Sequence, residues 1–342
     1  MAATLRDVAA LAGVSVKTVS NVVNGYAFVK PDNRRRVEEA LVATGYRPNL
    51  GARNLRRGRT GFLALMVPEL SIPYFGELAA LVITAAHDRE WNVLIEQTRG
   101  TRELERSTLA SLGPHLIDGA IISPEALHAD DLAAYDPGVP MVMLGEHALD
   151  VPLDRVAIDN VLAARTAVTH LVELGRRRIA CIGANPHRGT ATLRLEGYRA
   201  ALAAAGLPVA PELVAPAEKY HRRDGAEAMR ALLDLPEPPD AVFCFNDLLA
   251  VGALRAAAER GRRVPDDLAV VGFDGSEEGA YTVPTLTTID PDKAAIAERA
   301  VERVGDRIAG GADRTAEAVE IVTPFRLEIR ESTLGTGASA AE

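Results

Sequence analysis

The chain has 342 residues, of which 48% are hydrophobic and 25% charged, so it is long enough for several domains with buried cores. Residues 1–60 hold 11 Lys and Arg against 4 Asp and Glu, a balance of +7, whereas the remainder holds 27 against 43, a balance of −16. This basic head on an acidic body predicts contact with nucleic acid through the head alone. The lack of any run of about 18 apolar residues excludes a membrane-spanning helix.

Residues 4–25 are predicted to form two short helices separated by a glycine turn. Thr4 precedes the first helix and Asp7 follows three residues later, as in a capping box with Asp in place of Glu. Gly13 lets the chain leave that helix in a left-handed conformation, and Ser15 can cap the second helix. The apolar stripe of the first helix is expected to comprise Leu5, Val8, Leu11 and Ala12.

The second helix has the pattern of a DNA-reading helix. Its valines share one face, and polar residues occupy the other. A buried valine stripe behind a short polar row is what a helix in the major groove needs, so the pair is predicted to be a helix-turn-helix. A small amphipathic hairpin without a DNA role is the alternative. The valines are Val19, Val22 and Val23; the polar row is Lys17, Asn21 and Asn24, flanked by Val16 and Ser20.

A third helix over residues 32–44 is expected to close the small core through Val37, Ala40, Leu41 and Tyr46, with Arg34, Arg35 and Arg36 pointing outward. Pro48 ends the preceding helix. Residues 47–59 then form a basic segment that is too short to hold a helix alone in water. We expect it to become ordered on a partner, with its arginines on phosphates and Leu55 as a wedge between base steps. A plain basic linker is the alternative.

The body alternates continuous apolar strands with helices, which predicts parallel sheets buried on both faces. The strands fall into two sets, and two sets predict two Rossmann-like lobes. The expected strands are 62–67, 92–96, 119–122 and 141–144, then 179–182, 241–245 and 268–271; the expected helices are 74–89, 103–112, 160–174, 192–205, 222–233 and 246–260.

Three stretches, residues 4–25, 45–49 and 271–274, make the chain resemble the lac repressor family (LacI/GalR) of bacterial transcription regulators over residues 4–330. The resemblance implies a helix-turn-helix domain over 1–47, a hinge helix and linker over 48–60, and a periplasmic-binding-protein-like α/β core over 61–330. The first lobe would comprise about 61–159 and 290–321, and the second about 160–289 and 322–330, with crossings near 160, 290 and 322. Residues 331–342 are expected to be a disordered tail.

The resemblance also implies which residues meet DNA. Val16, Lys17 and Asn21 fall where the family contacts base edges, and their chemistry suits a thymine methyl, a guanine and an adenine, respectively. Another set falls at positions for phosphate contacts or caps, and the basic segment contributes the rest. These are Thr4, Ser15, Thr18, Ser20 and Asn24, and then Asn49, Ala52, Arg53, Leu55 and Arg56.

Ligands of open α/β sheets bind at the carboxyl ends of strands, so a site between the lobes is expected. Arg194, Asn246 and Asp274 offer a bidentate donor, a mixed group and an acceptor, which together suit sugar hydroxyls. Core packing is the alternative for Phe75, and helix capping is the alternative for either Asn246 or Asp247. The full set of predicted ligand residues is Tyr74, Phe75, Ser123, Glu146, Arg194, Asn246 and Asp274.

Other classes of protein find little support. The stretch after the first strand has no dinucleotide-binding glycines, the histidines lack metal-ligand spacing, and Asp274, Glu277 and Glu278 read as a surface loop, so we expect no enzyme, cofactor or metal. A periplasmic sugar-binding protein would share the lobes, but Arg6 and Asp7 stand where its export signal would be apolar.

The sequence therefore predicts a dimeric, effector-controlled transcription regulator, most simply a repressor. Two heads on a two-fold dimer would read a pseudopalindromic operator, and a small molecule between the lobes would control the affinity for DNA. A sugar is the expected effector and a nucleoside or purine the alternative. Residues 331–342 carry no leucine heptad, so a tetramer is not expected. Cys181 and Cys244 within predicted buried strands indicate reduced thiols and a cytoplasmic, nucleoid-associated protein.

Overall fold

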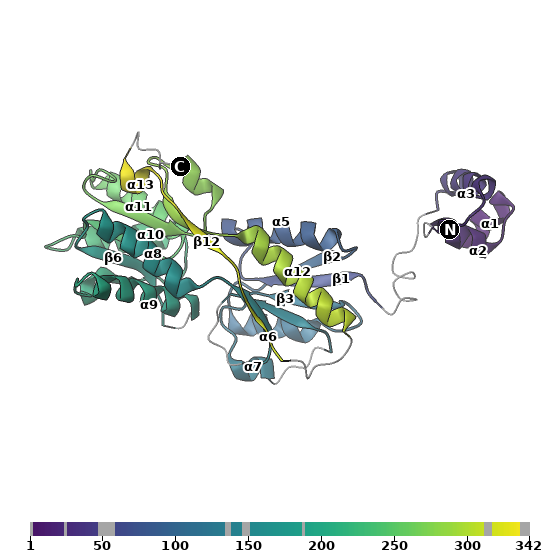
Figure 1. The fold of residues 1–342 in the computed structure, drawn as a ribbon, viewed down its shortest axis with the longest axis horizontal. Helices are drawn as coiled ribbons and strands as arrows, with labels where there is room; N and C mark the ends of the chain where they lie inside the picture. Colours follow the sequence, from purple (N-terminus) through teal and green to yellow (C-terminus); the bar gives the residue numbers. More distant parts are fainter. Residues whose placement is uncertain are drawn as a thin grey trace. The chain divides into compact units, whose positions relative to one another are not determined.

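The computed structural model describes residues 3–23, 26–46, 59–133, 138–145, 151–186, 189–310 and 317–335. They form two compact units divided between Thr60 and Gly61 (Figure 1). No helix within these ranges is long and apolar enough to cross a membrane. The expected hinge helix over 48–60 falls almost wholly outside the described residues.

The first unit consists of α1 (Leu5–Ala12), α2 (Val16–Val23) and α3 (Pro31–Thr44). The predicted capping box is confirmed: the Thr4 side chain accepts a hydrogen bond from the Asp7 backbone, and Asp7 Oδ2 accepts one from Thr4 N at 2.8 Å. Gly13 ends α1 in the left-handed conformation, with φ of 61°. Ser15 Oγ accepts from Thr18 N at 3.1 Å and so caps α2 as predicted.

The core of this unit contains Val8, Val19, Val22, Val37 and Ala40, as the sequence pattern predicts. The prediction for Leu11 is wrong, because this side chain is 59% exposed. Ala9 is buried instead, so the apolar face of α1 is rotated away from Leu11.

Arg35 is exposed, as predicted, and pairs on the surface with Asp32 and Glu39, whereas Arg34 and Arg36 are half-buried. Arg34 donates to the carbonyl of Tyr26 at 2.7 Å, and Arg36 to that of Gly13 at 3.4 Å. Two of the three arginines therefore fasten loops of the domain.

The first lobe of the second unit is a six-stranded parallel sheet in the order β11-β5-β4-β3-β1-β2. Alternate side chains of β1 face opposite layers: Leu63 and Leu65 join one hydrophobic cluster, and Ala64 and Met66 join another. Helices α5 and α12 lie side by side although they are far apart in the sequence (Figure 1). The strands are β1 (Phe62–Val67), β2 (Asn92–Gln97), β3 (Gly119–Ile122), β4 (Met141–Leu144), β5 (Asp154–Ala157) and β11 (Glu320–Val322); the helices are α5 (Pro73–His87), α6 (Arg102–Ser111), α7 (Ala129–Ala133) and α12 (Lys293–Ala309).

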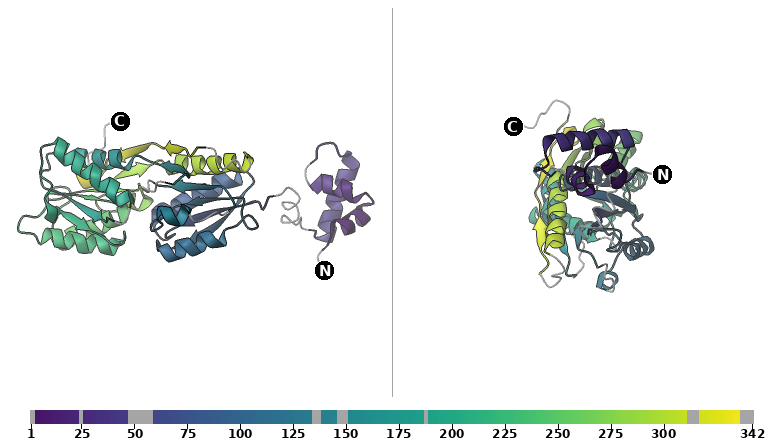
Figure 2. Two further views of the ribbon diagram at one scale, coloured as in Figure 1. Left: turned by 90° about the horizontal axis from the view of Figure 1, so that it is seen from below. Right: turned by 90° about the vertical axis from the view of Figure 1, so that its right-hand side faces the viewer.

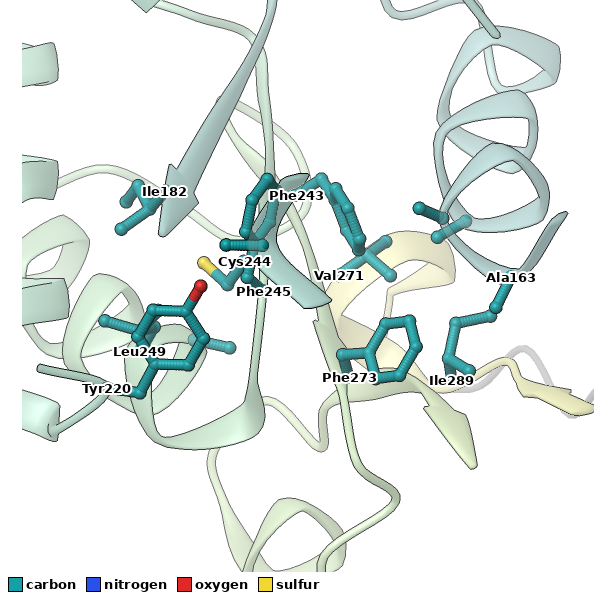
Figure 3. Close-up of a cluster of buried hydrophobic side chains, with 14 of the residues drawn as sticks. Ala163, Ile182, Tyr220, Phe243, Cys244, Phe245, Leu249, Val271, Phe273 and Ile289 are labelled. Atoms are coloured by element: carbon teal, nitrogen blue, oxygen red, sulfur yellow. The ribbon is translucent and has the colours of Figure 1, made fainter. Parts of the chain in front are cut away.

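The second lobe is a six-stranded sheet in the order β12-β10-β9-β8-β6-β7, in which only β12 is antiparallel to its neighbour. Helices cover both sides of each sheet (Figure 2). The aromatic residues Phe243, Phe245 and Phe273 pack in the core of this lobe (Figure 3). The strands are β6 (Ile179–Ala184), β7 (Val214–Pro216), β8 (Ala241–Cys244), β9 (Ala269–Phe273), β10 (Thr287–Pro291) and β12 (Phe325–Glu328); the helices are α8 (Asn160–Glu173), α9 (Gly189–Ala204), α10 (Arg222–Leu233), α11 (Asp247–Glu259) and the short η1 (Pro211–Leu213) and η2 (Glu277–Tyr281).

The chain passes between the sheets three times: between β5 and α8, between β10 and α12, and between β11 and β12. These passages connect the two lobes of the α/β body, which follows the helix-turn-helix unit in the chain. This is the fold class that the sequence predicted. Cys181 and Cys244 are free thiols buried in β6 and β8, as expected for packing residues.

A disordered tail starting at residue 331 is contradicted by helix α13 (Glu331–Leu334). Ser332 Oγ donates to the Val270 carbonyl at 2.6 Å and accepts from Thr287 N at 2.8 Å, while Thr333 Oγ1 lies 3.0 Å from His170 Nε2. Small polar side chains without an apolar run gave no sign of this docking, because it depends on partners in β9, β10 and α8. Residues 336–342 lie outside the described part of the chain.

A buried ion pair anchors the outer strands of the first lobe. The Asp154 side chain is 1% exposed and accepts hydrogen bonds from Arg303, Arg307 and the backbone of Val319. Burial alone would raise the pKa of this carboxyl, but the hydrogen bonds from Arg307 and Arg303 outweigh it and lower the pKa to about 2.

We expect Asp154→Asn to lower the free energy of unfolding by about 3 kcal/mol at pH 7, because it removes the charge of a buried carboxylate that two mostly buried guanidinium groups share. The lowered pKa gives stability that is present above about pH 4 and is lost as the pH falls toward 2, so the difference should shrink at pH 3. Urea unfolding can be followed with Trp91, the single tryptophan, which packs near Gly305 of α12. The exposed carboxylate Asp306 provides the control: Asp306→Asn should cost under about 0.5 kcal/mol. Equal costs for the two variants would contradict the assignment.

Candidate DNA interface and ligand cavity

Helix α2 presents a polar row on the surface of the small unit. Val16 is 42% exposed, Lys17 is exposed and Asn21 is half-buried, whereas Val19 and Val22 on the opposite side are buried. The three side chains predicted to meet base edges therefore lie on the outer side of a helix fixed by its core. This exposes an ammonium, an amide and a branched apolar group in one row, the groups that read major-groove edges.

The hydroxyl groups at the helix ends already have partners within the domain. Thr4 Oγ1 donates to Asp7 Oδ2 at 2.8 Å, and Ser15 Oγ lies 2.9 Å from Thr18 Oγ1. These side chains therefore stabilise the ends of α1 and α2 in the free protein. Ser20 is half-buried on α2. The remaining predicted DNA contacts, Asn24, Asn49, Ala52, Arg53, Leu55 and Arg56, lie outside the described residues.

In the body, a cavity of about 130 Å³ lies between the two lobes. At about 10–15 Å³ for one water molecule, it has the scale of a small metabolite. Six of the seven predicted ligand residues line it, and Glu146, the seventh, lies outside the described residues. The lining comes from strand ends and helix starts of both lobes and includes Tyr74, Phe75, Ser123, Glu125, Gly145, Asn160, Thr190, Arg194, Tyr220, Asn246, Phe273 and Asp274.

Arg194, on α9, is held rigidly in the cavity wall. Its guanidinium lies over the ring of Phe273 at 3.5 Å, a cation–π contact that uses one face of the group. Nε donates to Asn160 Oδ1 at 2.8 Å, and Nη1 donates to the carbonyl of Phe245. Nη2 donates no hydrogen bond to any residue that the structure describes, so this end of the fork remains available to a ligand.

Asp274, at the end of β9, is a buried acceptor without a donor. Its side chain lies 3.9 Å from Arg194 Nη1 and receives no hydrogen bond from the described residues. Its backbone φ is 112°, an uncommon value for a residue with a side chain. Burial raises the pKa of this carboxyl to about 7, an effect that the Arg194 charge opposes only in part. The prediction that Asp274 lies in a surface loop is therefore wrong, because this residue is only 8% exposed.

Asn246 takes the capping role that was the alternative to ligand binding. Its Oδ1 accepts from Leu249 N at 2.9 Å and its Nδ2 donates to the Tyr220 carbonyl at 3.1 Å, so it caps α11 while lining the cavity. Asp247 is turned away into the lobe, where Thr288 Oγ1 donates to it at 2.6 Å and Ser276 N at 2.7 Å. Burial raises the pKa of Asp247 to about 6 in spite of these hydrogen bonds.

Tyr74 and Phe75 form an aromatic wall at the start of α5. Their rings meet edge to face, with centroids 5.2 Å apart. Both side chains line the cavity while packing on the core, so Phe75 has the packing role that was the alternative, and its contact with a ligand stays a prediction. Ser123 lines the cavity too, in the loop that follows β3, and the buried Glu105 carboxylate fixes that loop by accepting from Glu125 N at 2.7 Å and Ala126 N at 3.0 Å.

The sequence did not point to Asn160, Tyr220 or Phe273 as cavity residues. Asn160 begins α8, directly after the first passage of the chain between the lobes. A residue at such a passage lies near the boundary of the lobes, and this position could have pointed to a role in the cavity. Tyr220 follows β7, a strand of only three residues that has no clear pattern. Phe273 lies two residues beyond the strand expected at 268–271, and its position beneath Arg194 of α9 depends on how the lobe folds, not on any local pattern.

Comparison with known proteins identifies the family. Residues 4–49 match the family described as "Bacterial regulatory proteins, lacI family", and residues 168–333 match the "Periplasmic binding protein-like domain". The HTH-type transcriptional repressor CytR of Escherichia coli (strain K12) is 35% identical over 310 residues, which cover 90% of this chain and 91% of that protein. The chain belongs to the LacI family of bacterial regulatory proteins.

Solved structures agree with this membership over nearly the whole chain. The lac repressor dimer bound to operator and the anti-inducer ONPF is 27% identical, with a TM-score of 0.86 over 97% of this chain and 99% of that one. The complex of the transcriptional regulator CelR with cellobiose is 35% identical, with a TM-score of 0.72 over 96% of this chain and 99% of that one. As a LacI-family member, the chain is a transcription regulator with a helix-turn-helix DNA-binding domain.

The buried carboxyl of Asp274 should make stability depend on pH. Because its pKa is raised from an ordinary 3.8 to about 7, the folded state keeps a proton that the unfolded state loses, so the free energy of unfolding falls as the pH rises from 4 to 7. Asp274→Asn cannot titrate. Its melting temperature relative to the unsubstituted protein should therefore be higher at pH 8 than at pH 5, with a free-energy gain of at most about 4 kcal/mol. Thermal unfolding at both pH values measures this.

The matched control is Asp266→Asn, which changes an exposed carboxylate of the same lobe. We expect its effect on the melting temperature to be the same at both pH values. An effect of Asp274→Asn that is equally independent of pH would contradict the raised pKa.

Proposed function

We propose that this regulator is a repressor that binds a pseudopalindromic operator as a dimer, and that a small uncharged molecule rich in hydroxyl groups, a sugar, controls its affinity for DNA from the cavity between the lobes. The observation that carries the effector site is the Asp274 carboxylate. It is buried, it faces the cavity, and no described residue donates a hydrogen bond to it. A ligand hydroxyl would donate a hydrogen bond to this carboxylate and thus stabilise the complex.

The balance of charge in the cavity favours an uncharged effector. Among the residues that the structure describes, the charged groups in its lining are two carboxylates, Glu125 and Asp274, and one guanidinium, Arg194. Since Arg194 already faces Asp274, Phe245 and Asn160, little positive charge remains for a phosphate or carboxylate ligand. The similar CelR was solved with cellobiose, an uncharged sugar, which supports this choice.

A nucleoside is a second candidate because of the aromatic wall. Tyr74 and Phe75 offer a surface on which a base can pack, while the ribose hydroxyls can reach Asp274. A thermal-shift series with cellobiose, ribose, cytidine and a sugar phosphate separates these classes, since a ligand at 100 times its Kd stabilises the folded state by about 2.7 kcal/mol. Stabilisation by the sugar phosphate alone would overturn the proposed effector class.

The proposal of a dimer on DNA draws on the small size of the DNA-binding unit and on one exposed apolar site. A single helix-turn-helix makes few contacts, and pairing two of them on a two-fold axis gives the specificity of a pseudopalindrome. In the body, Tyr281 is 78% exposed and Val283 is 95% exposed at the end of η2, an apolar pair that a second copy of the chain would cover. The similar lac repressor was solved as a dimer bound to its operator.

Arg194→Ala should abolish the response to the effector while leaving operator binding within about threefold, because the side chain serves the cavity and the operator is bound by the other unit. The melting temperature and the operator Kd of this variant and of the unsubstituted protein are measured with and without the compound that stabilises the unsubstituted protein. Arg199→Ala, which removes an exposed arginine of the same helix, is the control and should keep the full response. A normal response in Arg194→Ala would count against the proposed site.

Lys17→Ala and Asn21→Ala should weaken binding to the preferred operator by about 1–3 kcal/mol each, that is about 5- to 150-fold, and relax the base preference at one position. Operators selected from a random DNA pool and read by sequencing give both quantities. Lys30→Ala removes the same charge outside α2, at the start of α3, and should leave the preferred bases unchanged. If all variants lose affinity equally for every sequence, α2 does not read base edges.

A further inference from the structure

The ammonium of Lys293 lies beside the cavity where the lobes meet. Lys293 is the first residue of α12, directly after the second crossing of the chain, and its side chain is 11% exposed. Nζ donates to the carbonyls of Asp274 at 2.6 Å and Gly275 at 2.9 Å, both in the second lobe. It lies 3.1 Å from Oε2 of Glu77, on α5 of the first lobe. An ammonium has three donors, and these contacts use all of them.

Glu77 connects the same parts from the first lobe. While its Oε2 faces Lys293, its Oε1 accepts from the backbone N of Glu277 at 3.3 Å. Glu277 begins η2, the short helix that leads to the exposed Tyr281. We call Glu77, Lys293 and the turn 274–277 the interlobe clasp.

Asp274 belongs both to the clasp and to the cavity. Its carbonyl accepts from Lys293, its N–H donates to the Ile289 carbonyl at 2.8 Å, and its carboxylate faces the ligand space. The turn uses positive φ at two successive residues, 112° at Asp274 and 58° at Gly275. Such a turn has few alternative conformations that keep both carbonyls on one ammonium. A ligand that engages the carboxylate therefore acts on a peptide bonded to the other lobe.

The local charge makes the lysine hard to replace. Asp290 Oδ1 lies 3.6 Å from Nζ, so the ammonium serves the carboxylates of both Glu77 and Asp290. Asp290 would keep Arg326, whose Nη2 lies 2.8 Å from its Oδ2, but Glu77 would lose the cation that it faces and would lie across the boundary between the lobes from the buried Asp274. Loss of the cation should therefore open the lobes rather than leave them in place.

We propose that the Glu77–Lys293 pair is the positioning element that couples occupancy of the cavity to the relative placement of the two lobes. This proposal rests on the proposed function in assuming that the cavity is the effector site. The first experiment therefore needs no effector.

The first experiment measures the distance between the lobes in the ligand-free, full-length protein. Spin labels are attached through Glu103→Cys on α6 and Ala203→Cys on α9, which are exposed in different lobes, while Cys181 and Cys244 are buried. Labelled protein is diluted into an excess of unlabelled protein so that distances between subunits do not contribute, and double electron–electron resonance gives the distribution.

Lys293→Met and Glu77→Gln should each broaden this distribution and move its mean by more than about 2 Å. The control Arg299→Met removes a cation of the same helix that pairs with Glu302 on the surface, and it should overlay the unsubstituted protein. If Lys293→Met does not fold, Glu77→Gln decides, because Gln keeps the shape of a side chain that is one-third exposed. Unchanged distributions in the folded variants would overturn the proposal.

The second experiment measures the coupling itself. The operator Kd is determined with and without cellobiose or cytidine, whichever raises the melting temperature of the unsubstituted protein. In Lys293→Met the compound should still raise the melting temperature, but the ratio of the two Kd values should fall from the 5- to 150-fold typical of coupled sites to below about twofold. A retained ratio overturns the proposal. If no compound of the thermal-shift series stabilises the unsubstituted protein, the proposed effector class fails, and the ligand-free distances still decide the clasp.

Discussion

The parallel pairing of strands in two adjacent lobes is the constraint on which the rest of the body depends. Because the central strands of both sheets are buried and apolar, the polar side chains next to them lie in the turns that follow the strands, and parallel pairing brings those turns to one edge. Phe273 and Asp274 end β9, Asn246 follows β8, and Ser123 follows β3. The cavity is thus a consequence of the sheet topology, and the charges in it follow from the few residues that occupy these positions.

Continuous apolar runs made some strands predictable from the sequence and left others hidden. The strands β1, β3 and β4 have the predicted bounds because every residue in them is apolar or glycine. By contrast, β5, β7, β11 and β12 have three or four residues each and contain charged residues or proline, so their extended conformation depends on neighbours. Helix α12 was missed although Ile296, Ala300 and Val304 recur at helical spacing, and a closer reading of that spacing would have found it.

For the cavity as well, the sequence predicted some lining residues but not how their side chains are oriented. Arg194 and Asp274 were predictable, since an arginine among apolar residues and a carboxylate at a strand end both imply a partner. The orientation of Arg194 was not, because Asn160, Phe245 and Phe273 fix it from three different elements. Asn246 was correctly placed at the site, but its hydrogen bonds with Leu249 and Tyr220 make it chiefly a cap.

An effector can change the affinity for DNA only if it interacts differently with two conformations of the protein. The lining of the cavity contains a source of such a difference. A hydroxyl donor gains most where Asp274 remains desolvated, and Asp274 remains so while the lobes enclose it. The backbone of the same residue is held by Lys293, which Glu77 ties to the first lobe. If a ligand binds the Asp274 carboxylate as we propose, ligand contact and lobe placement meet at this one residue, through its side chain and its main chain respectively. Linkage then couples the two free energies.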